Sequence, residues 1–293
     1  MTGSLEWDAA LVAVLGLLVG SFLNVVIHRL PRMMEHQWAE ECAQWAQDQG
    51  LPAPAKPPAP DAERLSLWAP RSRCPGCGHR LRWHENIPLL SYLFLRGRCA
   101  GCHKRISVRY PLVELATALL FYACALRWGW SLPTAAWCGF CAALIALTGI
   151  DWDTTLLPDD ITLPLLWAGL LAATLGWTGV APVDAIVGAA GGYLSLWCVY
   201  WGFKLATGKE GMGYGDFKLF AALGAWLGWQ ALVPVVLLAS IIGALVGIAM
   251  KLLQSLREGR YVPFGPFLAG GGLAVMLWGP GRVMAALTSM LGL

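Results

Sequence analysis

Apolar runs long enough to cross a lipid bilayer recur along most of this 293-residue chain. A helix needs roughly 20 apolar residues to cross the hydrocarbon core. Hydrophobic residues make up 57% of the chain and charged residues only 13%, which is unlike a soluble domain. We therefore expect an all-α polytopic membrane protein with about eight transmembrane helices, near residues 9–28, 110–128, 133–150, 161–179, 183–205, 217–229, 231–253 and 264–288.

The chain divides into three predicted parts. Residues 1–29 form the first transmembrane helix, residues 30–109 form a soluble module with a proline-rich spacer, and residues 110–293 form a transmembrane core. Most of the twenty-one Lys and Arg lie between Arg29 and Arg109. Because cytoplasmic loops carry the excess of basic residues, the module is expected on the cytoplasmic side and the N-terminus outside.

Two aspartates lie where this topology places the cytoplasmic membrane boundary. Asp151 ends the third predicted span in LTGIDWDTTLLPDD, and Asp216 begins the sixth in GMGYGDFKLF. Helix capping is the alternative for each, but ionisable groups at membrane depth are functional by default. Two carboxyl groups brought together can share a proton, so that one takes a proton from water and the other gives one to a departing amine. This is the chemistry of an aspartic protease.

Glycines surround the second aspartate. Gly213 and Gly215 precede Asp216 and remove steric bulk there. Glycine lets the backbone approach another group closely. We expect both glycines to give a peptide substrate or the Asp151 loop close access to the carboxyl group.

Four cysteines form a pattern typical of a metal site. Cys74-Pro-Gly-Cys77 and Cys99-Ala-Gly-Cys102 are two CxxC turns separated by twenty-one residues. This spacing predicts a small zinc-ribbon-like module with a four-thiolate zinc site. Disulfides are the alternative, although they are rare in the cytosol. Four sulfur ligands leave no position for water, so the predicted role of the Zn²⁺ is structural.

Three polar residues in the first two predicted spans have open roles. Asn24 and His28 lie near the inner end of the first span, where they either line the active site or form hydrogen bonds between helices. Glu114 in the second span needs a partner, with Arg109 and Lys218 as candidates, and it is also a candidate to bind a basic peptide.

Several motifs together resemble a known family. Gly213-Tyr214-Gly215-Asp216 is a GxGD motif, and Ile150-Asp151 is followed by Leu157-Pro158-Asp159. The paired CxxC turns and three further stretches occur in the order of that family: GSFLNVVIHRLP, NIPLLSYLFLRGRC and RYPLVELATALLF. With these motifs the chain resembles the type IV prepilin peptidases, bifunctional leader peptidase and N-methyltransferase enzymes of the bacterial inner membrane.

The resemblance implies roles for particular residues. Asp151 and Asp216 would be the catalytic pair, acting on prepilins and pseudopilins of pilus or secretion systems at the cytoplasmic side of the bilayer. The newly exposed residue would be N-methylated with S-adenosylmethionine. Gly97 in LRGRC is the matching glycine for methyl transfer, and a turn before the second CxxC is its alternative role. No glycine fingerprint of a dinucleotide-type fold is present, so the methyltransferase activity rests on the resemblance alone.

Other function classes remain open at this stage. A peptidase without methyl transfer, a non-proteolytic transporter and a membrane-tethered zinc-ribbon scaffold are the alternatives. The aspartates gather at one membrane face instead of forming a path through the spans, which disfavours a transporter. A scaffold would leave the GxGD loop unexplained. We expect no nucleic-acid partner.

Overall fold

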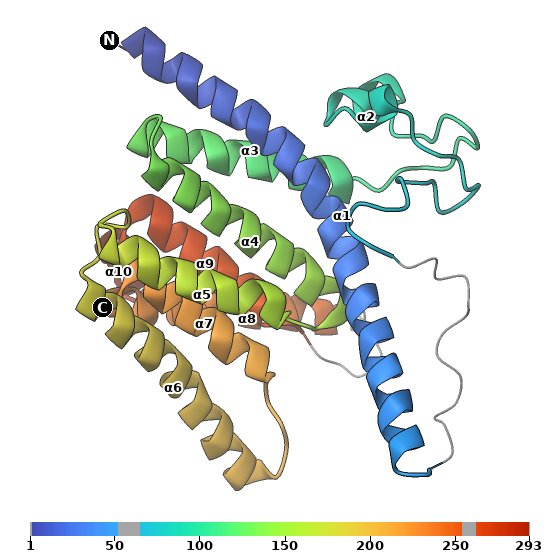
Figure 1. Cartoon of the computed structure of the whole chain (residues 1–293). Helices are drawn as coiled ribbons and strands as arrows, with labels where there is room; N and C mark the ends of the chain where they lie inside the picture. The colour runs from blue at the N-terminus through green and yellow to red at the C-terminus, as the bar shows by residue number, and fades with distance from the viewer. Residues whose placement is uncertain (1, 52–64, 254–261, 293) are drawn as a thin grey trace. The chain divides into compact units, whose positions relative to one another are not determined.

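The computed structural model describes residues 2–51, 65–253 and 262–292, and all regular structure in these ranges is helical. The helices, in chain order, are α1 (Thr2–Asp48), α2 (Leu90–Phe94), α3 (Arg109–Trp128), α4 (Leu132–Thr154), α5 (Asp159–Thr174), α6 (Pro182–Thr207), α7 (Tyr214–Leu227), α8 (Leu232–Leu252), α9 (Gly265–Trp278) and α10 (Pro280–Leu291), with short 3₁₀ turns η1 (Trp83–Asn86) and η2 (Trp229–Ala231) (Figure 1). Most of the proline-rich spacer lies outside the described residues.

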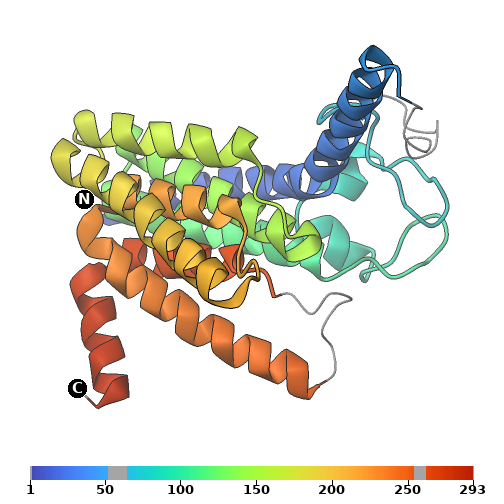
Figure 2. The same cartoon turned by 90° about the horizontal axis from the view of Figure 1, so that it is seen from below.

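Fewer helices are long enough to cross a membrane than the eight that the sequence predicts. In the described ranges, five helices pass by length and composition, namely α1, α3, α4, α6 and α8. The pair α9 and α10 adds a sixth if it is counted as one span, although it bends by 113° at Gly279 (Figure 2). The predicted fourth and sixth spans became α5, with 16 residues, and α7, with 14. Gly176, at positive φ, follows α5 and ends it before the predicted limit at residue 179, whereas α7 is about as long as the short span predicted at 217–229 and is followed by Gly228, also at positive φ.

The chain forms two compact units, residues 10–122 and residues 1–9 together with 123–293. The helix that contains the first predicted span continues past residue 29. It is α1, which ends at Asp48 and has Pro31 inside it. The domain limits at residues 29 and 109 stay predictions.

In the unit of residues 10–122, α1 and α3 pack closely because glycines face the contact. A Cβ atom at Gly20 would lie 2.7 Å from Glu114 Cα, and one at Gly16 would lie 2.8 Å from Ala118 Cα. Small residues that let backbones approach in this way are typical of helix contacts in membranes. Asn24 adds a hydrogen bond across the contact, its Nδ2 donating to the carbonyl of Tyr110 at 3.1 Å.

In the other unit, α7 is the central helix. Every residue from Asp216 to Trp226 is buried except Lys218, and the helix packs against α5, α6 and α9 (Figure 1). Glycines permit the contact with α6, where the backbones of Gly188 and Gly224 touch and a Cβ at Gly192 would lie 2.6 Å from the carbonyl oxygen of Phe220. The buried position of α7 places its first turn, with Asp216, inside the protein.

Replacement of Gly224 by valine should destabilise this unit. Its side chain would collide with the carbonyl of Gly188 on α6. Overpacking of this kind costs about 1–3 kcal/mol of unfolding free energy. We expect a lower thermal transition of the purified protein in detergent. Gly202→Val on α6 is the matched control, since no described atom lies within 4 Å of a Cβ there. Equal transitions for the two variants would contradict the packing described.

Candidate active site

The two predicted aspartates belong to the same unit and are both buried. Asp151 lies in the last turn of α4 and Asp216 in the first turn of α7. Their exposed fractions are 4% and 7%. Gly265, which contacts the carboxyl group of Asp151, and Gly215, the residue before Asp216, both contact the side chain of Leu157. The structure thus brings together the two acids that the sequence singled out, 65 positions apart in the chain (216 − 151).

Asp151 is held by the start of a third helix. Its Oδ2 accepts the backbone N–H of Gly265, the first residue of α9, at 3.0 Å. A carboxylate is stabilised at the N-terminus of a helix because the free N–H groups there carry partial positive charge. Only glycine fits, since a Cβ at residue 265 would lie 2.5 Å from Asp151 Oδ2. Sequence reasoning missed Gly265. The Pro266 that follows was its one signal, because proline favours the first turn of a helix.

Leu157 connects the pieces of the site. It lies in the loop between α4 and α5, and it packs against both Gly215 and Gly265. A Cβ at Gly215 would lie 2.7 Å from Leu157 Cβ, and one at Gly265 would lie 3.2 Å from its Cδ1. One loop side chain therefore contacts the starts of α7 and α9, and this arrangement places Asp216 beside Asp151.

Of the two glycines of the GxGD motif, Gly215 is the one in close contact with the loop that follows Asp151. Gly215 is in tight contact with Leu157. At Gly213 the nearest described atom to a Cβ would be Gly215 N at 4.0 Å, and the backbone is extended, with φ −84° and ψ 154°. Any residue adopts this conformation. Gly213 is the residue before α7, and its carbonyl accepts the N–H of Asp216 at 3.3 Å.

Asp216 has unused bonding capacity. Its Oδ1 is buried and has no hydrogen-bond partner among the described residues. Such an atom is costly unless it carries a proton or meets a polar group. Asp159, nearby in the chain on α5, is engaged elsewhere, because both of its carboxylate oxygens accept from Lys218 Nζ at 2.7 Å. Oδ1 of Asp216 is thus suited to contact a substrate.

The four cysteines come together in the other unit. Their sulfur atoms all lie within 4.8 Å of one another, with 3.8 Å between Cys74 and Cys102 and 3.9 Å between Cys77 and Cys99. Four sulfurs at 2.3 Å from one tetrahedral metal ion would be about 3.8 Å apart. The group can therefore hold a metal ion.

In each CxxC turn a backbone N–H group stabilises the thiolate of the first cysteine. The N–H groups of Gly76 and Gly101 donate to the sulfurs of Cys74 and Cys99, both at 3.4 Å. The bond from Gly76 lowers the pKa of Cys74 to about 6. A thiolate, and not a thiol, is the form that binds metal. The donor set and the turn geometry both suit a soft or borderline cation.

Comparison with known proteins decides the family. Residues 14–128 match the bacterial peptidase A24 N-terminal domain, and residues 138–248 match the type IV leader peptidase family. A prepilin leader peptidase/N-methyltransferase of Aeromonas salmonicida is 54% identical over 92% of this chain and 90% of its own length. The chain belongs to the type IV leader peptidase family.

Further relatives in this family carry the same name. The protein of Pseudomonas putida is 51% identical over 96% of this chain and 94% of its own length. That of Burkholderia pseudomallei is 50% identical over 92% of this chain and 85% of its own length. No solved structure gives a significant match. Asp151 and Asp216 lie in the segment matching the leader peptidase family, and the four cysteines lie in the segment matching the N-terminal domain, whereas Gly265 lies beyond both.

The remaining polar residues of the sequence analysis lie in the unit of residues 10–122. Asn24 forms the interhelical hydrogen bond that was one of its two expected roles. Glu114 Oε2 accepts the backbone N–H of Leu89 at 2.9 Å, a partner that the sequence did not suggest. Lys218 pairs with Asp159 instead. Gly97 has a φ of +66°, which favours glycine, and its N–H donates to the carbonyl of Tyr92 at 2.8 Å.

Proposed function

We propose that this protein cleaves the leader peptide of type IV prepilins and pseudopilins by an aspartic protease mechanism, and then N-methylates the residue that cleavage exposes. The observation that carries the peptidase proposal is the pair of buried carboxyl groups, one bound to the start of α9 and the other with an unpartnered oxygen. The names of the relatives supply the substrate class and the second activity.

The two carboxyl groups have different hydrogen-bond partners, which suggests a different catalytic role for each. A water molecule between the carboxyl groups adds to the scissile carbonyl, and the C–N bond then breaks. Asp151, which accepts the N–H of Gly265, is placed to hold negative charge and take the proton of the water. Asp216, whose Oδ1 is unpartnered, is placed to deliver a proton to the departing amine. Cleavage gives a leader carboxylate and a new amino terminus.

The proposed topology has eight crossings, with the N-terminus in the periplasm and the aspartates at the cytoplasmic boundary of the inner membrane. It adds α5, α7 and the bent α9–α10 pair to the five long helices. The site supports the crossing of α5. Asp151 ends α4, and Asp216 follows α6. Because α6 is long enough to cross the membrane, the two aspartates can lie at the same face only if α5 also crosses it. A prepilin helix lying in the bilayer would present its scissile bond at this level.

N-methylation needs a methyl donor and a new amino terminus that is held beside it. We propose Zn²⁺ as the ion of the four-cysteine site, with a structural role, and S-adenosylmethionine as the donor. When bound, the donor supplies an electrophilic methyl group. The new amino terminus would receive this methyl group and would lose a proton in the exchange.

Incubation of the purified protein with a synthetic prepilin tests both activities in one measurement. The mass of the peptide should fall by the leader in either condition, and the mature product should gain one methyl group only when S-adenosylmethionine is present. Unchanged mass over prolonged incubation would reject the peptidase proposal. Cleavage without any methyl gain would favour the peptidase-only alternative.

A valine substitution in the GxGD motif tests the packing of the site. Gly215→Val should lower the rate of leader cleavage by roughly 10²-fold, because its side chain would displace Leu157 and with it the relative positions of the two carboxyl groups. Gly202→Val on α6 is the matched control and should cleave at a nearly normal rate, because no described atom lies within 4 Å of a Cβ there. Similar rates for the two variants, measured with the same prepilin, would count against the arrangement around Leu157.

A further inference from the structure

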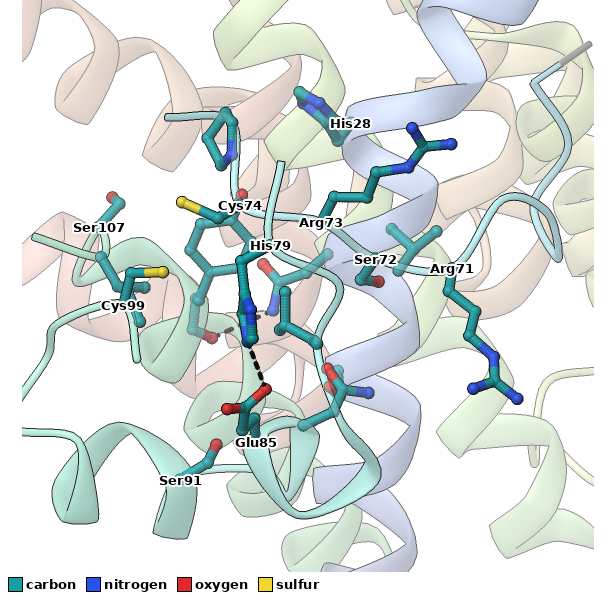
Figure 3. Close-up of a pocket in the computed structure, with 18 of the residues that line it drawn as sticks. His28, Arg71, Ser72, Arg73, Cys74, His79, Glu85, Ser91, Cys99 and Ser107 are labelled. Carbon is teal, nitrogen blue, oxygen red and sulfur yellow. Dashed lines mark hydrogen bonds and ion pairs between the residues drawn. The ribbon is translucent and has the colours of Figure 1, made fainter. Parts of the chain in front are cut away.

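Four of the nine cysteines form the four-cysteine group in the unit of residues 10–122. Two of them, Cys74 and Cys99, line a cavity of about 740 Å³ in that unit (Figure 3). The other five cysteines have no part in this group (9 − 4). They are a separate set of candidate metal ligands, because thiolates are good ligands for soft cations.

Sulfur atoms from three helices meet in the unit of residues 1–9 and 123–293. The Sγ of Cys141 on α4 lies 3.9 Å from the Sγ of Cys124 on α3 and 3.7 Å from the Sδ of Met276 on α9. The exposed fractions are 0% for both cysteines and 4% for the methionine. A buried cysteine by itself acts as a small apolar residue. Here, however, two thiols and a thioether from separate helices are in contact.

The spacing of these sulfur atoms suits a single metal ion. A trigonal ion with metal–sulfur bonds of about 2.3 Å, the length found at zinc–thiolate sites, has its sulfur ligands about 4.0 Å apart. The observed distances of 3.9 and 3.7 Å are close to this value. A set of thiolate and thioether ligands selects Cu(I) over hard cations. We propose that Cys124, Cys141 and Met276 bind one Cu(I) ion.

A positive charge lies beside the proposed copper site. Binding of Cu(I) converts both thiols to thiolates and releases their protons, so the site gains a net negative charge. A charge inside an apolar segment is costly unless an opposite charge is near it. Arg127 follows Cys124 by one helical turn on α3, and its Nη1 donates to the carbonyl of Met276 at 2.5 Å. The guanidinium group of Arg127 is therefore placed to compensate the charge of the occupied site.

The proposed copper site lies on two helices that also build the candidate active site. On α4, Asp151 follows Cys141 by ten residues (151 − 141), and on α9, Met276 follows Gly265 by eleven (276 − 265). These separations correspond to about 15–17 Å along each helix. The hydrogen bond from Gly265 to Asp151 joins α4 and α9 at one end, and a bound ion would join them at the other. Because a ligand of the folded state stabilises it, we expect Cu(I) to raise the thermal transition.

Copper binding by the purified, reduced, zinc-loaded full-length protein in detergent tests the proposal. The chelator bathocuproine disulfonate sets the concentration of free Cu(I), and elemental analysis gives the copper and zinc bound per chain. Cys141→Ala should bind one Cu(I) fewer per chain than the unaltered protein, with the same zinc content. An equal zinc content shows that the difference does not arise at the four-cysteine group. Cys198→Ala is the matched control, because Cys198 is an exposed thiol on α6 of the same unit.

Met276→Leu tests the same site with little change of side-chain volume, so that the protein remains folded. It should raise the free Cu(I) concentration at which this ion half-saturates the protein, and it should reduce the copper-dependent rise in the thermal transition. Met290→Leu is the matched control, because Met290 is 84% exposed, and it should change neither quantity. Equal copper content in Cys141→Ala and the unaltered protein, or an unchanged half-saturation point in Met276→Leu, would overturn the proposal. Loss of the ion in Cys198→Ala would also overturn it, since the copper would then be bound by a surface thiol.

Discussion

Asp151→Asn and Asp216→Asn should each slow leader cleavage by roughly 10³-fold or more while leaving the protein folded in the membrane. Asparagine has nearly the same shape as aspartate, but it can neither take a proton from water nor deliver one to the departing amine. Both positions are buried, so the exchange removes a charge without opening a cavity. Cleavage of a synthetic prepilin, followed by mass, measures the loss.

Two neighbouring aspartates provide controls for this result. Asp153 on α4 and Asp160 on α5 are exposed, and their replacement by asparagine should leave cleavage nearly unchanged. Methylation provides a second control, since Asp151→Asn and Asp216→Asn should still methylate a peptide that already begins at the mature residue. A variant at Asp151 or Asp216 that cleaves at the normal rate would exclude that residue from catalysis.

Removal of the metal ion is expected to abolish methylation while largely sparing cleavage. Structural zinc contributes apparent binding free energies of about 10–16 kcal/mol in small zinc-finger peptides, so its loss should unfold the stretch that contains the CxxC turns. The cysteines belong to the unit of residues 10–122, and the aspartates belong to the other unit. Chelation, or replacement of Cys74 or Cys102 by serine, should therefore increase proteolysis between residues 71 and 108.

Metal content, methyl gain and leader loss should be measured on the same samples. Cys42→Ser is the matched control, because Cys42 is an exposed thiol on α1 outside the four-cysteine group. It should keep its metal and both activities. Normal methylation by a protein shown to be free of metal would contradict a structural role for the ion.

The sequence identifies the reactive residues of the candidate site, but it does not identify the residues that position them. Asp151 and Asp216 stand out because charged residues are rare in apolar segments, and the cysteines stand out by their paired spacing. Gly265 and Leu157 carry no such signal. Their roles depend on which backbone N–H and which loop side chain meet the carboxyl groups, and only the packed structure determines this.

Helix lengths are a second point at which sequence patterns were insufficient. Apolar content continues past the end of α5, so hydropathy alone extends this helix to residue 179. Gly176, at positive φ, ends α5 because the chain turns there. The sequence also did not predict the cavity in the unit of residues 10–122, because its lining comes from segments far apart in the chain. The hydrogen bond between Glu114 and the N–H of Leu89 was hidden for the same reason.

The most direct test of the shared role of the two aspartates compares the single variants with the double variant in single-turnover cleavage of a prepilin. If the two carboxyl groups work as one unit, Asp151→Asn combined with Asp216→Asn should retain about the same slow rate as either single variant, because the first substitution already dismantles the pair. A double variant slower than both singles by the product of their separate losses would mean independent roles and would contradict this account.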